Sequence, residues 1–149
     1  MLLALILAAF PTSSVACPDL SGTFSDRDLF RMQMVQKDCT ELRMMTSTDP
    51  KNPNPPPNGE PDTQVFTIDC QKHQGMFQMD AVCWNKDVLE SWTYSKDVHG
   101  VWTPFSIRRL YLDANGRDLH DEAWATDASG DQKLYQSATY KRQAKRAAR

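Results

Sequence analysis

Residues 29–36 read LFRMQMVQ, and apolar and polar side chains alternate along this stretch. Phe30, Met32 and Met34 fall on one side of an extended chain, with polar side chains between them. A repeat of two residues is the signature of a β-strand with one buried face. The stretch therefore predicts a sheet that covers an apolar interior, with further strands before and after it in the sequence.

Further strand patterns follow one another along the chain and are separated by short turns. Lys37 and Asp38 form the first turn, residues 85–87 form a second, and the similar sequences DANG (113–116) and DASG (127–130) form two more. Such turns join antiparallel neighbours, and no amphipathic helical pattern lies between them. We expect strands at residues 20–24, 29–36, 42–46, 65–69, 77–84, 88–94, 101–112, 119–125 and 133–142.

This succession predicts an all-β fold, an antiparallel up-and-down meander of about eight or nine strands closed into a small barrel. Closure pairs the two edges that an open meander would expose. A β-sandwich is the alternative. Pro104 predicts an edge or a bulge in the long strand that contains it, and a change of alternation near Arg108 and Arg109 predicts a second bulge.

The strands are predicted to form one domain, residues 17–142, which is long enough for a core of its own. Residues 48–62 hold six prolines in 15 positions, so we expect an extended loop there instead of a strand. Residues 143–149 are expected to form a basic, flexible tail.

The charge is unevenly distributed. The last nine residues hold five Lys or Arg and no acid, which leaves 12 Lys or Arg against 19 Asp or Glu elsewhere. An acidic body argues against nucleic acid as a partner, because nucleic acid requires a basic contact surface. Apart from the first residues, no apolar run approaches 18 residues, so no membrane span is predicted, and we expect a monomer.

Residues 1–16 are predicted to be a secretory signal peptide. Nine apolar residues from Leu2 to Phe10 are too few to span a bilayer, and Ser14-Val15-Ala16 offers the small residues that signal peptidase requires. No Lys or Arg precedes the run, which leaves open a longer precursor, and a buried N-terminal helix is the alternative. The signal predicts a periplasmic or secreted protein.

A cysteine follows the predicted cleavage site, as it does in bacterial lipoproteins, so an outer-membrane lipoprotein anchored through Cys17 is an alternative localisation. Lipidation of Cys17 would leave three cysteines, whereas four form two disulfides in an oxidising compartment. If the strand after Cys17 pairs with the next one, Cys39 comes within reach of Cys17. Cys70 and Cys83 then pair by elimination, although a tight turn at residues 71–75 would place Cys70 opposite Met76.

Motifs for catalysis or metal binding are weak. His73, His99 and His120 lack the spacing of zinc or haem sites. Asp118 and Glu122 share a strand face with His120 and could hold a metal, but an exposed polar strand gives the same pattern. Nucleophile elbows, phosphate loops and C-x-x-C motifs are absent. We therefore predict no enzyme, catalytic residue, metal or cofactor.

Methionine and aromatic side chains provide a different kind of candidate site. Methionine adapts to irregular apolar surfaces, and a barrel of about eight strands is wide enough to be filled or to hold one small molecule. Ordinary core packing is the alternative. The predicted ligand contacts are Phe30, Met32, Met34, Phe66, Phe77, Met79 and Trp92.

The two ends of the predicted domain resemble the calycin group, which includes lipocalins, fatty-acid-binding proteins and small bacterial relatives. The segment Leu20-Ser-Gly-Thr-Phe24 resembles the opening G-x-W of those barrels, with Phe24 in place of tryptophan, and Tyr140-Lys-Arg142 resembles their last strand. The opening Cys-Pro-x-Leu-x-Gly-Thr and the segment around Cys39 also resemble small secreted bacterial proteins. The resemblance implies structural roles for Gly22, Phe24 and Arg142, with the guanidinium of Arg142 packed over Phe24 at the closed end of the barrel.

The resemblance also implies a function. We expect a lipocalin-like binding protein for a small, largely apolar ligand, located in the periplasm or secreted. The alternative is a secreted, disulfide-stabilised inhibitor or a cell-envelope interaction protein that acts through its loops.

Overall fold

The computed structural model describes residues 17–26, 30–48 and 62–144. The predicted signal peptide, almost all of the Pro-rich loop and the end of the basic tail lie outside these residues. The described chain is all-β, and it contains no helix long and apolar enough to cross a membrane. Its strands are β1 (Gly22–Asp26), β2 (Phe30–Lys37), β3 (Glu41–Thr48), β4 (Asp62–Thr67), β5 (His73–Gln74), β6 (Met79–Asn85), β7 (Val88–Lys96), β8 (Trp102–Leu112), β9 (Asp118–Thr126) and β10 (Gln132–Arg142).

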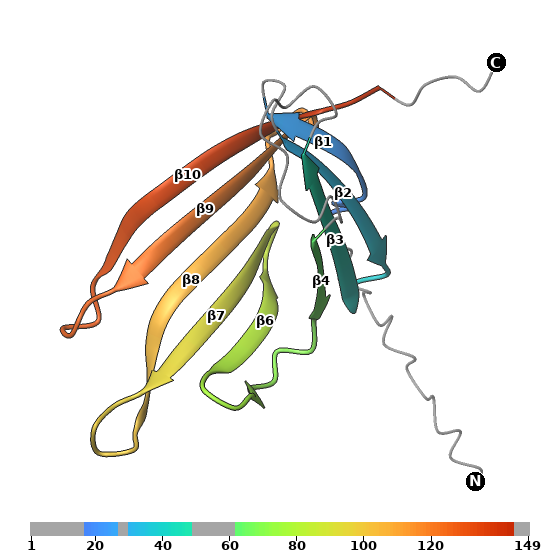
Figure 1. Cartoon of the computed structure of the whole chain (residues 1–149). Helices are drawn as coiled ribbons and strands as arrows, with labels where there is room; N and C mark the ends of the chain where they lie inside the picture. Colours follow the sequence, from blue (N-terminus) through green and yellow to red (C-terminus); the bar gives the residue numbers. More distant parts are fainter. Residues whose placement is uncertain (1–16, 27–29, 49–61, 145–149) are drawn as a thin grey trace, which may run out of the picture.

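The ten strands form one antiparallel sheet in the order β4-β3-β2-β1-β10-β9-β8-β7-β6-β5. The first and last strands are hydrogen-bonded to each other, with Phe24 opposite Arg142 and Ser25 opposite Lys141. The sheet curls so that β4 and β6 face each other in Figure 1. The antiparallel meander was therefore predicted correctly. The β1–β10 pair joins the two ends of the meander, but the edge strands β4 and β5 are not paired with each other, so the hydrogen-bonded ladder does not run around the whole barrel.

The predicted strands lie close to the observed ones, with three differences. Strand β4 begins at Asp62, three residues before the predicted strand, and the two-residue strand β5 was not predicted. Strand β6 begins at Met79, because a turn closed by the Gly75 N–H and the Gln78 carbonyl (2.8 Å) precedes it. This turn was expected at residues 71–75, and its shift leaves Phe77 outside the strand.

The two bulge predictions for β8 have different outcomes. The register between β7 and β8 slips where Tyr94 faces Pro104, so the bulge expected at Pro104 is present. The pairing runs evenly through Arg108 and Arg109, so the second predicted bulge is wrong. Arg108 instead lies on the inner face of an unbroken strand.

Three hairpin turns share one construction, the sequence Asp-x-x-Gly. The carboxylate of Asp97 accepts hydrogen bonds from the N–H groups of His99 and Val101, both at 2.8 Å. Asp113 and Asp127 likewise accept bonds from backbone N–H groups of their own turns. Each glycine has a positive φ, which a residue without a Cβ adopts at little cost. All three turns were predicted, the third as the connection at residues 95–100 between the strands expected at 88–94 and 101–112.

The core lies inside the curled sheet towards the end where β1 meets β10. Phe24 has no exposed surface, and the Arg142 guanidinium carbon lies 5.1 Å from the centre of its ring. A Cβ on Gly22 would lie 3.4 Å from the same ring, so this position has little room for a side chain. The contact that the calycin resemblance implied is present. The core consists of Leu20, Phe24, Met32, Met34, Leu42, Met44, Ile68, Val82, Leu89, Leu110 and Leu119.

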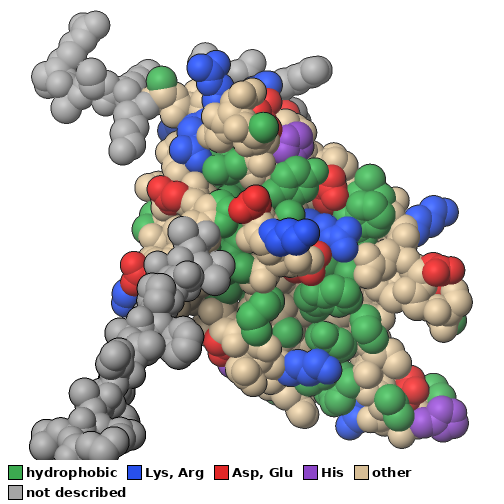
Figure 2. Space-filling model, turned by 180° about the vertical axis from the view of Figure 1, so that it is seen from behind, with side chains coloured by type: hydrophobic (Ala, Val, Ile, Leu, Met, Phe, Trp, Pro, Cys, Tyr) green, Lys and Arg blue, Asp and Glu red, His purple; other side chains and the backbone are tan. Residues whose placement is uncertain are grey.

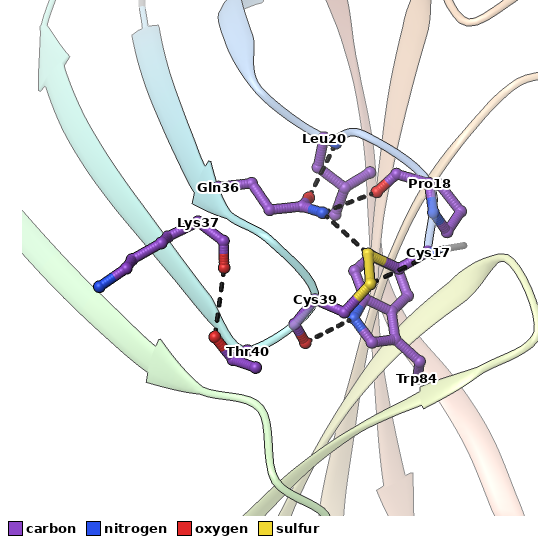
Figure 3. Close-up of a disulfide and its surroundings, with 8 residues drawn as sticks. All are labelled: Cys17, Pro18, Leu20, Gln36, Lys37, Cys39, Thr40 and Trp84. Carbon is purple, nitrogen blue, oxygen red and sulfur yellow. Dashed lines mark hydrogen bonds between the residues drawn. A yellow bond between two sulfur atoms is a disulfide. The ribbon is translucent and has the colours of Figure 1, made fainter. Parts of the chain in front are cut away.

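Both predicted disulfides are present. Cys17 is bonded to Cys39, and Figure 3 shows the Gln36 side chain beside this bridge. The Gln36 amide accepts a hydrogen bond from the Leu20 N–H (3.0 Å) and donates one to the Pro18 carbonyl (3.0 Å). These bonds fix the segment before β1 against the end of β2, which is the geometry that the pairing was predicted from.

The second disulfide joins the β4–β5 connection to β6. Cys70 is bonded to Cys83, and the Cys70 N–H donates to the Val82 carbonyl at 3.0 Å. Because the turn lies at residues 75–78, Cys70 faces Val82 and not Met76, which removes the difficulty noted for this pairing. The bridge therefore attaches the connection between the two sheet edges to the neighbouring strand.

Candidate functional site

A cavity of about 590 Å³ lies between β4 on one side and β6, β7 and β8 on the other. It occupies the part of the interior where the sheet has its two edges, β4 and the two-residue β5, which are not hydrogen-bonded to each other. Its lining residues are Gln64, Val65, Phe66, Thr67, His73, Gln78, Asp80, Val82, Ser91, Thr93, Ser106, Ile107, Arg108, Ala123 and Tyr135.

One of the lining residues, Arg108 on β8, belongs to an ion pair with Asp121 on β9. The Arg108 guanidinium binds the Asp121 carboxylate through two bonds, Nε to Oδ1 (2.9 Å) and Nη2 to Oδ2 (2.7 Å). Its Nη1 also donates to Gln64 Oε1 on β4, at 3.2 Å. Arg108 thus reaches across the interior and connects β8 with the opposite edge of the sheet.

The electrostatics of this pair follow from its burial. Burial disfavours the charged form of Arg108, but the hydrogen bonds and the attraction of Asp121 outweigh it, and the pKa of Arg108 is raised. Burial, with the negative charge of Asp121 as a second cause, raises the pKa of Tyr140 on the same inner face. Both side chains therefore keep their ordinary protonation states at neutral pH, Arg108 charged and Tyr140 neutral.

A second hollow of about 240 Å³ shares Arg108, Ala123 and Tyr135 with the first one, and Asp121 and Gln136 complete its lining. Tyr135 is the extra residue of a bulge in β10, between Leu134 and Gln136. Arg108 thus lines both spaces, and Asp121 lines the second one.

Three of the predicted ligand contacts lie on the inner face. Phe66 lines the cavity and packs against the core. Met32 and Met34 are buried members of the core. Contact with a ligand stays a prediction for these three residues, and it is most direct for Phe66.

The other four predicted contacts lie elsewhere. Phe30 is half exposed at the start of β2, and Phe77 is 86% exposed in the β5–β6 turn because β6 starts later than expected. Met79 and Trp92 alternate with cavity-lining residues of β6 and β7, so they lie on the opposite face of the sheet. None of the four is among the residues that line the cavity.

Trp92 belongs to an ordered layer on that outer face. In register across β7, β8 and β9, Trp92 lies opposite Ile107, which lies opposite Trp124. The next row is Glu90, Arg109 and Glu122, in which Arg109 Nε donates to Glu90 (2.9 Å) and the two indole N–H groups donate to the glutamates. These large side chains thus cover the outer face of β7, β8 and β9, the strands whose inner face lines the cavity.

The residues that were considered for metal binding are engaged in other contacts. Asp118 pairs with Lys141, His120 stacks on Tyr111, and Glu122 accepts hydrogen bonds from Tyr111 and Trp124. Within the described residues, no group of three His, Cys, Asp or Glu side chains is arranged to hold a metal ion.

Arg108, which lines the cavity, and its partner Asp121 were not among the predicted site residues. A signal was available, because Arg108 is in phase with Leu110 along β8, and Asp121 is in phase with Leu119 along β9. Two opposite charges at inward positions of strands that become neighbours indicate an internal ion pair. Recognising it requires the register of β8 against β9.

Seen from behind the view of Figure 1, the molecule has hydrophobic side chains gathered over the middle and lower part of one face, with small groups of acidic and basic side chains among them (Figure 2). This face therefore has no large area of a single charge.

No family model and no curated protein matches the sequence. Among solved structures, the chain is similar to a mutant of the fluorescent protein UnaG, with 11% sequence identity and a TM-score of 0.53. The likeness covers 85% of this chain and 97% of UnaG. At this identity the comparison concerns the fold alone, and it supports a calycin-like β-barrel architecture for this protein.

Proposed function

We propose that the protein binds a small, largely apolar molecule with some hydrogen-bonding groups, in the cavity between β4 and β6. The observation that carries the proposal is the cavity itself, whose volume of about 590 Å³ is in the usual range for small-molecule sites. Phe66 and Val82 offer apolar contact, and Gln64 and Arg108 offer hydrogen bonds. The calycin-like fold, which encloses such a space, supports the same proposal.

We further propose a binding role and not a catalytic one, outside the cytoplasm. Arg108, which lines the cavity, is ion-paired with Asp121, and this pairing favours a fixed polar contact over proton transfer. Two disulfides are compatible with an oxidising compartment. N-terminal sequencing of the protein from its own host tests the localisation, because a periplasmic or secreted protein is expected to begin at Cys17.

The binding proposal is tested with anilinonaphthalene sulfonate, a fluorescent probe with apolar rings and one sulfonate group, on the chain from Cys17 to Arg149. Ser91→Phe places a ring inside the cavity, and Ser137→Phe places the same ring on the exposed part of β10. We expect Ser91→Phe to weaken probe binding by about tenfold or more, because the added ring occupies space that the probe needs. Ser137→Phe is expected to bind the probe as the unmodified protein does.

Native mass spectrometry of protein from its own host identifies the physiological ligand as a mass difference that disappears on denaturation. Thermal unfolding of both variants controls for folding. A folded Ser91→Phe protein that binds the probe as tightly as the unmodified chain contradicts the proposal.

A further inference from the structure

Two neighbouring turns present bare apolar side chains to solvent. In the β5–β6 turn, Met76 is 87% exposed and Phe77 is 86% exposed. In the β7–β8 turn, Val98 is 96% exposed and Val101 is also exposed. We call these four residues the apolar rim. Exposed apolar side chains are common singly, but a group of them at one end of a molecule indicates an interaction surface.

The two turns project from the same end of the sheet. Strands β6 and β7 are paired neighbours, and Met79 at the start of β6 lies opposite Tyr94 near the end of β7. The residues just before Met79 and just after Lys96 therefore extend beyond the same edge, as the lower ends of these hairpins show in Figure 1. The contact between β1 and β10, with Phe24 and Arg142, lies at the opposite end of the molecule.

Aromatic and basic side chains lie directly behind the apolar rim. The Lys72 ammonium lies 4.6 Å from the centre of the Tyr94 ring, and the Lys96 ammonium lies 5.7 Å from the centre of the Trp102 ring. Tyr94 and Trp102 are half-buried. The exposed apolar side chains of the rim therefore lie at the tips of the turns, and the rings of Tyr94 and Trp102 with their lysine ammonium groups lie behind them. This is the order in which side chains are distributed across a membrane–water interface.

The β7–β8 turn also contains an acidic residue, Asp97, directly before Val98 of the rim. The Asp97 carboxylate accepts the N–H groups of His99 and Val101, and so it faces its own turn. Asp127, in the next turn at this end, is held in the same way by Ser129 and Asp131. Lys72 and Lys96 have no carboxylate partner among the ion pairs of the described residues.

We propose that the apolar rim inserts into the surface of an anionic lipid membrane, with Tyr94, Trp102, Lys72 and Lys96 at the headgroup level. The shape favours lipid over a protein partner, because Met76, Phe77 and Val98 are convex tips on two separate turns. Such tips enter a fluid surface without a matching pocket, whereas a protein would need one for each. The proposal goes beyond ligand binding in the cavity and does not depend on it.

The test measures partitioning of the chain from Cys17 to Arg149 onto vesicles, because residues 2–10 would themselves partition. The vesicles consist of phosphatidylcholine alone, or of phosphatidylcholine mixed with phosphatidylglycerol. We expect Met76→Ser combined with Phe77→Ser to weaken partitioning by about tenfold or more, as apolar burial is lost. Val98→Ser should weaken it severalfold, whereas the matched change Val35→Ser, on the exposed face of β2, should have no effect.

The charge contribution is tested separately. Exchange of Lys72 and Lys96 for Glu is expected to abolish the preference for phosphatidylglycerol. A blue shift of tryptophan emission on vesicle binding, lost in Trp102→Phe, is expected to locate this end at the interface. A chain that ends at Ala144 is expected to bind as before, because the basic tail is not part of the rim.

Either of two results would overturn the proposal. One is that the chain fails to bind both kinds of vesicle. The other is that the Met76→Ser/Phe77→Ser variant binds like the unmodified protein, with the tail accounting for the binding. The probe titration of the cavity is carried out without vesicles, so failure of membrane docking and failure of ligand binding are distinguishable.

Discussion

Phe24 is the residue on which the junction of the first and last strands depends most. Its side chain is fully buried, and the Arg142 guanidinium covers its ring. We expect Phe24→Ala to lower the free energy of unfolding by about 3–5 kcal/mol, because it removes a large buried ring and leaves a cavity. Urea denaturation measures the change, with the exposed Phe105→Ala as control. A loss similar to that of the control would contradict this role.

Arg108 and Asp121 form a second residue-scale test, since each neutralises the other in the interior. Asp121→Asn leaves a largely buried guanidinium without its countercharge, and we expect it to cost about 1–3 kcal/mol of unfolding free energy. The double change Arg108→Met with Asp121→Leu should cost less than the single one, because no unpaired charge remains. Chemical denaturation of both variants gives the comparison. A larger loss in the double variant would show that the pair stabilises the fold through its attraction.

At the scale of elements, the Asp-x-x-Gly turns are expected to make the stability of their hairpins depend on pH. A hydrogen bond from the Ser129 side chain, and then one from the Asp131 N–H, lower the pKa of Asp127 below its ordinary value of 3.8. Backbone N–H groups of Asp118 and Arg117 lower the pKa of Asp113 in the same way. A carboxyl group whose pKa is lower in the folded state than in the unfolded state stabilises the fold at pH values above its unfolded-state pKa. This stabilisation is lost as the pH falls through the folded-state pKa.

We therefore expect the stabilising contribution of these two turns to be constant at neutral and mildly acidic pH and to be lost progressively as the pH falls below about 3.8. Asp113→Asn and Asp127→Asn should lower the melting temperature at neutral pH and have less effect at strongly acidic pH. Thermal unfolding across this range measures the difference. An effect that does not change with pH would mean that the carboxylate charges are not responsible.

The elements also show how far the sequence could be used for prediction. Strands such as β2 and turns such as Lys86–Asp87 were predictable because their signal is local, a period of two residues or a two-residue connection. Strand β5 has two residues and no periodic signal. The open edge at β4 and the Arg108–Asp121 pair depend on which distant strands become neighbours. Alternation along a single strand does not contain that information, and so the cavity could not be predicted from it.

At the scale of the whole molecule, the last strand completes the fold. Tyr140 packs against the core, and Arg142 pairs with β1. A chain that ends before Tyr140 is expected to be unfolded, because the inner face of β1 loses its neighbour. A chain that ends at Ala144 is expected to keep its full stability. Circular dichroism and thermal unfolding of the two truncated chains provide the measurement, and a folded shorter chain would contradict the importance of the β1–β10 pair.

The pairing of β1 with β10 also has a kinetic consequence. Every other ladder joins strands that are adjacent in the sequence, whereas Ser25 and Gln143, which are hydrogen-bonded beside this pair, are 118 residues apart. Closing so long a loop is entropically expensive, and folding slows as contacts become less local. Two meanders, β1–β4 and β5–β10, are therefore expected to form early and to join slowly. Stopped-flow refolding should show Phe24→Ala slowing folding, whereas Leu110→Ala, within a local ladder, should mainly accelerate unfolding.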